Sequence, residues 1–146
     1  MFNTSLFDES TFYPEFGKDL LHATREVVIE SPFITINRAN KLLPTFNRLI
    51  KQGVKVFIIT RQPSLHDYPM NQQSEEIIRY FEDIGVQVLV TKNNHHRKLA
   101  IIDRNILWEG SLNILSQCNS REIMRRTEGD NHAQIMFDFL RLDRFI

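Results

Sequence analysis

Short apolar runs alternate with segments of helical periodicity along the chain, and this order predicts an α/β fold. Four runs rich in β-branched residues are typical of strands buried in a sheet, and they span residues 27–29, 54–59, 86–90 and 98–103. Apolar residues that recur at spacings of three and four predict helices, over residues 39–52, 75–84 and 131–142. A weaker pattern predicts a first helix from Pro14 to Arg25.

Proline and glycine residues mark several of the predicted boundaries. Pro32 interrupts the first strand, so that the segment from Phe33 to Ile36 reads as its continuation after a bend. Pro44 either kinks the second helix or marks its start, and Gly53 follows as its C-terminal cap. Residues 2–14 contain scattered phenylalanines without periodicity, so no element is predicted there.

The last predicted strand begins a hairpin. Residues 103–105 supply a polar turn, and residues 106–108 return as the partner strand. A chain of 146 residues is long enough to build one domain with its own core. We therefore expect a single domain over residues 1–146, in which helices sandwich a mixed β-sheet.

Reactive side chains gather around this hairpin. Alternation along a strand places His96 and Lys98 on one face and Arg97 on the other. Ser111 and Asn113 follow the returning strand and therefore lie at the same end. One imidazole, one ammonium and two neutral donors around a common point suit a tetrahedral phosphate better than a carbonyl.

The spacing of these residues resembles a known signature. The HKD motif of the phospholipase D superfamily is similar to the run His96-x-Lys98-x4-Asp103-x6-Gly110-Ser111-x-Asn113. Six prescribed residues, each used at about a few per cent, coincide by chance in on the order of one window in a hundred million. The resemblance implies a phospholipase D-like fold with one motif per chain. It also implies phosphodiester chemistry that uses neither a metal nor a cofactor.

The resemblance further implies a role for each motif residue. His96 becomes the nucleophile that forms a phosphohistidine intermediate. Lys98, Ser111 and Asn113 stabilise the non-bridging oxygens as charge builds in the transition state. Asp103 holds the structure of the motif through hydrogen bonds, and we count it among the catalytic residues. Gly110 has no side chain, which suits close approach of the backbone to substrate.

Two further parts of the machinery follow from the resemblance. A downstream glutamate fixes the orientation of the nucleophile, and Glu122 is the first candidate, with Glu128 as the alternative. Members with a single motif are homodimers whose composite active site uses one histidine from each chain. We therefore expect a two-fold dimer, in which His96 of the second chain is the general acid.

Charged residues are balanced over the whole chain but not around the motif. Lys and Arg number 18, as do Asp and Glu, so bulk charge does not indicate a nucleic-acid binder. A local basic excess over residues 92–126 favours a polyanionic substrate. We expect substrate contacts from Arg97 and Arg61, and the loop after Arg61 adds two candidates, His66 and Tyr68.

Other features narrow the cellular setting and the chemistry. Cys118 is the only cysteine, so no intrachain disulfide forms. The sequence has neither a signal-peptide pattern nor an apolar run of about 20 residues, so we expect a cytoplasmic protein that is not bound to a membrane. A zinc site built from His95, His96, Cys118 and His132 is disfavoured because CxxC and HxxxH spacings are missing.

Three functions remain open from the sequence. The first is a metal-independent endonuclease acting as a dimer on nucleic acid, with DNA favoured over RNA. The second is a nucleic-acid-binding or dimerisation domain belonging to a larger helicase or restriction protein. The third is phosphatidyl hydrolysis or transfer on phospholipids, which no sequence feature favours.

Overall fold

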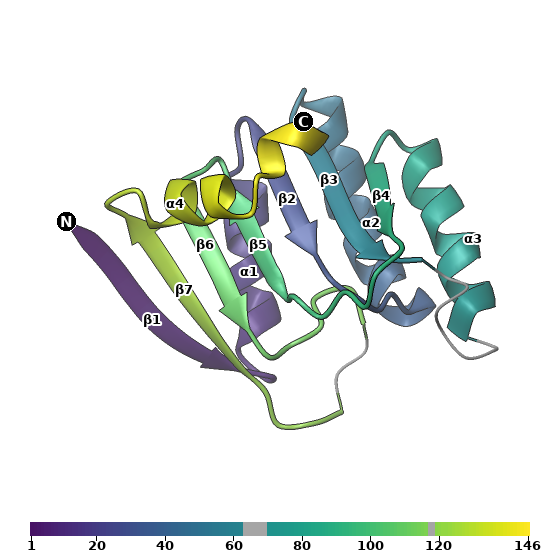
Figure 1. Ribbon diagram of the computed structural model, residues 1–146, viewed down its shortest axis with the longest axis horizontal. Coiled ribbons are helices and arrows are strands. Elements are labelled where there is room, and N and C mark those ends of the chain that lie inside the picture. The colour runs from purple at the N-terminus through teal and green to yellow at the C-terminus, as the bar shows by residue number, and fades with distance from the viewer. Residues whose placement is uncertain (63–69, 117–118) are drawn as a thin grey trace.

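The computed structural model describes residues 1–62, 70–116 and 119–146. Its elements are β1 (Phe2–Asp8), α1 (Phe12–Leu21), β2 (Glu26–Glu30), α2 (Ile36–Lys51), β3 (Lys55–Arg61), α3 (Met70–Asp83), β4 (Gln87–Thr91), β5 (Leu99–Ile102), β6 (Ile106–Gly110), β7 (Ile123–Gly129), α4 (His132–Phe139) and the 3-10 helix η2 (Leu142–Phe145). Within these residues, one seven-stranded sheet has the order β1-β7-β6-β5-β2-β3-β4 (Figure 1). No helix in the described part of the chain is both long and apolar enough to cross a bilayer.

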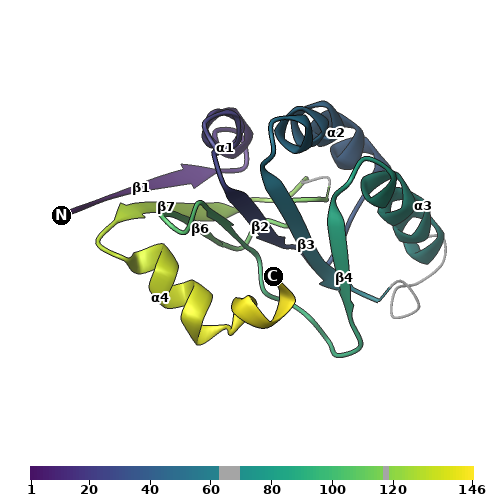
Figure 2. The ribbon, with the colours of Figure 1, turned by 90° about the horizontal axis from the view of Figure 1, so that it is seen from above.

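Helices cover both faces of this sheet in two unequal layers (Figure 2). The first layer consists of α1, α2 and α3, and the second of α4 and η2. Side chains of β2 alternate between two buried clusters, Val27 and Ile29 with the first layer and Val28 with the second. Each fully buried side chain of this size contributes about 1.5–3 kcal/mol to folding. The predicted α/β sandwich with a mixed sheet is therefore confirmed.

Strand directions bring His96, Lys98 and Ser111 of the motif to one edge of the sheet. β2, β3 and β4 are parallel, β5 is antiparallel to β2, and β6 is antiparallel to β5. The start of β5 and the end of β6 therefore lie beside the carboxyl ends of the parallel strands. We call this the motif edge, and its strands reach it at Glu30, Arg61, Thr91, Leu99, Gly110 and Ile123.

Two strands were not predicted, and they pair with each other. β1 is antiparallel to β7, from Phe2 opposite Gly129 to Asp8 opposite Ile123. β1 is an edge strand that is exposed at nearly every position, so its sequence lacks an apolar face. β7 was missed because it contains the charged residue Arg126, which is unusual within a partly buried strand. In the folded protein Arg126 is paired with the carboxylate of Asp19, at 2.8 and 2.9 Å, from a distant part of the chain.

Helix boundaries also differ from those predicted, while the hairpin is confirmed. The segment after Pro32 does not continue β2, because Ile36 already begins α2. α2 then passes through Pro44 without a break. β5 and β6 pair as predicted around the turn at residues 103–105, where Asp103 and Arg104 both have φ of 53°.

Candidate active site

The histidine and lysine of the motif lie at the motif edge, on residues 92–98, which lead from β4 into β5 and which we call the HxK segment. The amide of Gly110, at the end of β6, donates to the carbonyl of Lys98 at 3.4 Å. The next amide along, that of Ser111, donates to the carbonyl of Ile123 at the start of β7, at 2.9 Å. Residues 98, 110, 111 and 123 therefore lie close together where β5, β6 and β7 reach the motif edge.

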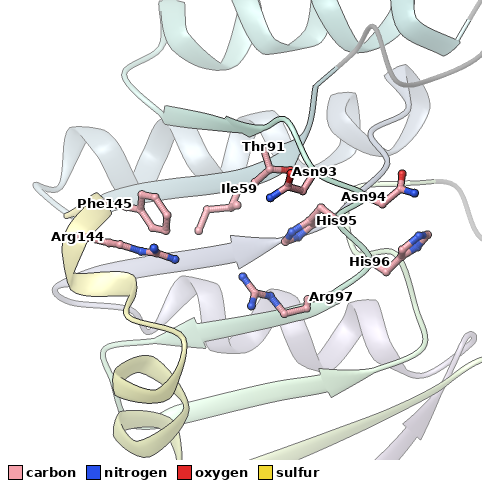
Figure 3. A pocket seen from close by; sticks show the side chains of 9 residues that line it. All are labelled: Ile59, Thr91, Asn93, Asn94, His95, His96, Arg97, Arg144 and Phe145. Atoms are coloured by element: carbon pink, nitrogen blue, oxygen red, sulfur yellow. The ribbon is translucent and has the colours of Figure 1, made fainter.

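The side chains of His96 and Arg97 point in different directions, as alternation along the strand predicts (Figure 3). His96 is exposed at the open end of a row of side chains and points away from Arg97 (Figure 3). The ammonium of Lys98 donates to the carbonyl oxygen of His96 at 2.7 Å. Arg97 instead turns to the buried carboxylate of Glu30, with its Nε and Nη2 at 3.2 and 3.0 Å from Oε1. A cation and an accessible imidazole therefore lie two residues apart on the same segment.

Ser111 and Asn113 serve this edge in different ways. The hydroxyl oxygen of Ser111 accepts a hydrogen bond from the amide of Ile123 at 3.0 Å, so it also holds the start of β7. Asn113 is half-buried, and its Oδ1 has no hydrogen-bond partner among the described residues. An unpaired buried amide oxygen is costly unless a ligand or water satisfies it. The Oδ1 atom of Asn113 is therefore available to a ligand or a water molecule.

Gly110 is required by the close packing of β6 against β7. A Cβ atom at this position would lie 2.1 Å from the carbonyl oxygen of Ile123 and 2.9 Å from the Cα of Met124. The space left by the missing side chain is therefore filled by β7, and close packing of the strands explains the glycine without a contact to substrate.

Asp103 lies at the opposite edge of the sheet, one strand length from His96. Its carboxylate accepts the backbone amides of Thr24, Arg25 and Glu26 at 2.9, 2.7 and 3.0 Å. Partial burial raises the pKa of Asp103, but the hydrogen bonds from these amides prevail and leave it below its usual value. These hydrogen bonds agree with the expectation that Asp103 holds the structure of the motif. They do not place its carboxylate beside His96 or Lys98, as a catalytic role would require.

A buried cluster beside His96 was not predicted. Glu30 is fully buried at the end of β2, and the Nε2 atom of buried His95 lies 3.4 Å from its Oε1 without hydrogen-bond alignment. Since Arg97 binds the same oxygen, both neighbours of His96 in the sequence approach one carboxylate. The only sign of this in the sequence is a glutamate that ends the apolar run VVIE.

Burial sets the charge of this cluster. Burial lowers the pKa of His95 to about 4, and the positive charge of Arg97 acts in the same direction, so its ring is neutral at pH 7. Burial raises the pKa of Glu30, and the opposing effect of Arg97 is smaller. The cluster thus pairs one guanidinium with one carboxylate beside a neutral imidazole.

The two candidate glutamates lie at opposite edges. Glu122 directly precedes β7 at the motif edge, where its carboxylate accepts a hydrogen bond from Ser120 at 2.8 Å. Glu128 pairs with Ile106, at the far end of β6, and binds Arg126 at 3.2 Å. Of the two, Glu122 is at the motif edge.

Several arginines of the basic segment 92–126 are paired with carboxylates, which reduces the positive charge available to a substrate. Arg61 donates to Asn94 Oδ1 at 3.0 Å, which places it beside the HxK segment. Arg97, Arg104 and Arg126 bind Glu30, Glu26 and Asp19 respectively. The sequence could not show these pairs, because each carboxylate comes from a distant part of the chain. His66 and Tyr68 lie outside the described residues.

Comparisons with known proteins identify the same family over most of the chain. The sequence model described as "Cardiolipin synthase, PLD-like domain" matches residues 18–137. No curated protein sequence matches this chain. Among solved structures, NucT from Helicobacter pylori is 22% identical with a TM-score of 0.70, covering 95% of this chain and 93% of its own.

Two other structures show how widely this fold is used. Nuc from Salmonella typhimurium, a phospholipase D family member, is 14% identical with a TM-score of 0.77, over 99% of this chain and 95% of its own. TrmBL2, an archaeal chromatin protein that binds DNA, is 11% identical with a TM-score of 0.61. The match covers 92% of this chain but 49% of TrmBL2.

Proposed function

Since the chain belongs to the phospholipase D superfamily, we propose that it is a metal-independent phosphodiesterase that cleaves DNA as a homodimer. The observation that carries the proposal is the motif edge, where one exposed imidazole lies beside an ammonium and two neutral side chains, those of His96, Lys98, Ser111 and Asn113. The full-length likeness to Nuc and NucT supports a nuclease among the activities found in this family.

His96 would carry out the first step. Its neutral imidazole attacks phosphorus, the bond to the leaving oxygen breaks, and a phosphohistidine forms that water then hydrolyses. The leaving oxygen needs a proton, which His96 of the second chain would supply as general acid. Glu122, on the same edge, is our candidate for orienting the nucleophile.

Lys98 and Asn113 would stabilise the transition state. Charge develops on the non-bridging oxygens during attack, and donors already held in place stabilise it without further reorganisation. The ammonium of Lys98 is tied to the His96 backbone at 2.7 Å, so it moves with the nucleophile. Arg61, tied to Asn94, would add a contact to a neighbouring phosphate.

Cleavage of single- and double-stranded DNA in excess EDTA tests the proposal. We expect cleavage by the wild type and its loss, by at least about a thousandfold, in His96→Ala, because the nucleophile is removed. His22→Ala is the matched control, since His22 is exposed on the helical side of the chain near α1 and lies outside the site. Equal cleavage by wild type and His96→Ala, or loss of wild-type cleavage in EDTA, would refute the proposal.

A DNA-binding domain without catalysis is the second candidate. TrmBL2 shows that this fold occurs within a DNA-binding chromatin protein, and a larger helicase or restriction protein would be a comparable setting. This candidate predicts salt-sensitive DNA binding by both wild type and His96→Ala, with cleavage by neither.

A further inference from the structure

A cavity of about 380 Å³ opens beside the nucleophile, on the face of the sheet that carries η2. Figure 3 shows its lining side chains, which come from β3, β4, the HxK segment and η2. His96 lies at one end of this cavity, and Arg144 and Phe145 lie at the other. The volume falls within the range of about 300–1,000 Å³ that is usual for small-molecule sites.

The walls of the cavity differ in character. Phe145 is partly buried, and its ring lies beside the buried side chain of Ile59 (Figure 3). Asn93, Asn94 and Arg97 supply polar groups on the wall that leads to His96. A flat ring with a polar edge, such as a nucleobase, fits an aromatic and apolar wall that faces hydrogen-bonding groups.

The charge of the cavity is positive. Arg97 and Arg144 both extend into it, and the nearby carboxylate of Glu30 is already bound by Arg97. Arg144 has no ion pair within the described residues, and its Nε donates to the carbonyl of Arg141 at 3.1 Å. Its guanidinium carbon lies 4.8 Å from the centre of the Phe145 ring, and its positive charge acts to lower the pKa of Glu30. His95, in the floor, is neutral at pH 7 and adds no charge. One guanidinium is therefore left over for an anion, and guanidinium groups bind phosphate well.

We propose that this cavity binds the nucleotide next to the scissile phosphate, with its base against Phe145 and its phosphate on Arg144. The placement of His96 at the mouth makes the neighbouring phosphate the one that is attacked. The inference rests on the proposed function and deepens it, because it gives the enzyme a contact with one base beside the cleaved bond. Phosphate contacts alone would make the site indifferent to bases.

Cleavage kinetics of the full chain on a single-stranded oligonucleotide test the contribution of the cavity. For Arg144→Gln and Phe145→Leu we expect KM to rise about tenfold, since a phosphate contact or a stacked base is worth about that factor, while kcat stays within about twofold. Arg141→Gln and Phe139→Leu are matched controls, because both residues are exposed on the same part of the chain and neither lines the cavity. Leucine at 145 keeps the apolar packing, and melting temperatures verify folding.

Binding of small probes provides a second readout that needs no catalysis. Thymidine 5′-monophosphate, deoxyribose 5-phosphate and inorganic phosphate are titrated into wild type and variants and followed by NMR. We expect thymidine 5′-monophosphate to bind most tightly, Phe145→Leu to remove its advantage over deoxyribose 5-phosphate, and Arg144→Gln to weaken all three. Equal affinity for the first two probes in the wild type would overturn the assignment of a base site.

The two experiments separate this inference from the proposed function. Unchanged KM in both variants, with His96-dependent cleavage intact, would overturn the nucleotide site and leave the nuclease standing. Probe binding that depends on Arg144 and Phe145, in a wild type that does not cleave DNA, would leave the site standing and refute the nuclease.

Discussion

Glu30 shows how a single buried residue can organise a reactive segment. It is fully buried at the end of β2, binds Arg97 and lies 3.4 Å from His95. These two residues flank His96, and the hydrogen bonds from Arg97 hold this segment against the end of β2. A charge buried in this way is costly unless it is paired, which makes the Arg97 contact necessary for Glu30 itself.

The substitution Glu30→Gln should therefore impair catalysis, although Glu30 is buried and does not contact substrate. The charge-assisted bond to Arg97 weakens, the HxK segment loosens, and we expect kcat to fall about tenfold with KM changed by less than about twofold. Steady-state kinetics measure this split, and the substitution Glu82→Gln, at an exposed position of α3, is the control. A fall in kcat that merely follows the fraction of unfolded protein would contradict a positioning role.

His95 predicts a dependence of folding stability on pH. Its pKa is about 4 in the folded chain and 6.5 when unfolded, so the unfolded chain binds more protons between these values. The free energy of unfolding is therefore highest above about pH 6.5, where the ring is neutral in both states. It falls by up to about 3 kcal/mol as the pH drops towards 4, because the unfolded chain then binds a proton that the folded chain does not.

Urea unfolding at several pH values, with His95→Gln as reference, isolates this effect. From pH 7 to pH 4, the free energy of unfolding of the wild type should fall more than that of the variant. The raised pKa of Glu30 acts in the opposite direction, but Glu30 is present in both proteins, so its effect largely cancels in the difference. A difference that does not change with pH would contradict the buried neutral state of His95.

At the scale of elements, β6 and β7 pack closely at Gly110, near the site. Any side chain at Gly110 would collide with the backbone of Ile123, at 2.1 Å from its oxygen. The collision is with backbone in a paired strand, which cannot rotate away. The glycine of the motif thus keeps β6 and β7 together, so that Ser111 meets the start of β7.

Gly110→Ala should destabilise the protein by about 3 kcal/mol, or prevent folding, because the strands must separate. Gly17→Ala in α1 is the contrasting variant, since nothing lies within 4 Å of an added Cβ there. It should stabilise the protein by about 0.5–1 kcal/mol through helix propensity. Thermal melts of both variants test the pair, and equal melting temperatures would contradict this account of Gly110.

Elements that bury a clear apolar face could be predicted from the sequence, and elements that do not could not. Strands β2 to β6 and helices α2 to α4 have such a face, and their positions were predicted to within a few residues. β1 is nearly all exposed, and β7 carries charges that are neutralised only after folding. Neither pattern has the periodicity on which the prediction depended.

At the scale of the whole molecule, the proposed dimer should appear in mixing experiments. If each active site needs His96 from both chains, a heterodimer of wild type and His96→Ala is inactive. After subunit exchange at equal amounts, activity should fall to about 25% of the all-wild-type value at the same total protein, as random pairing predicts. Activity near 50%, proportional to the wild-type fraction, would show that each chain works independently.

The sequence alone determined the family, the α/β class and the identity of the motif residues, because residue spacing and apolar periodicity are local properties. Only the tertiary structure showed that Asp103 lies across the sheet from His96 and that Gly110 packs on β7. It also brought Glu30 to the residues that flank His96 and Arg144 to the cavity beside them. These contacts join segments far apart in the chain, and their partners are chosen by strand order and burial, which no local pattern records.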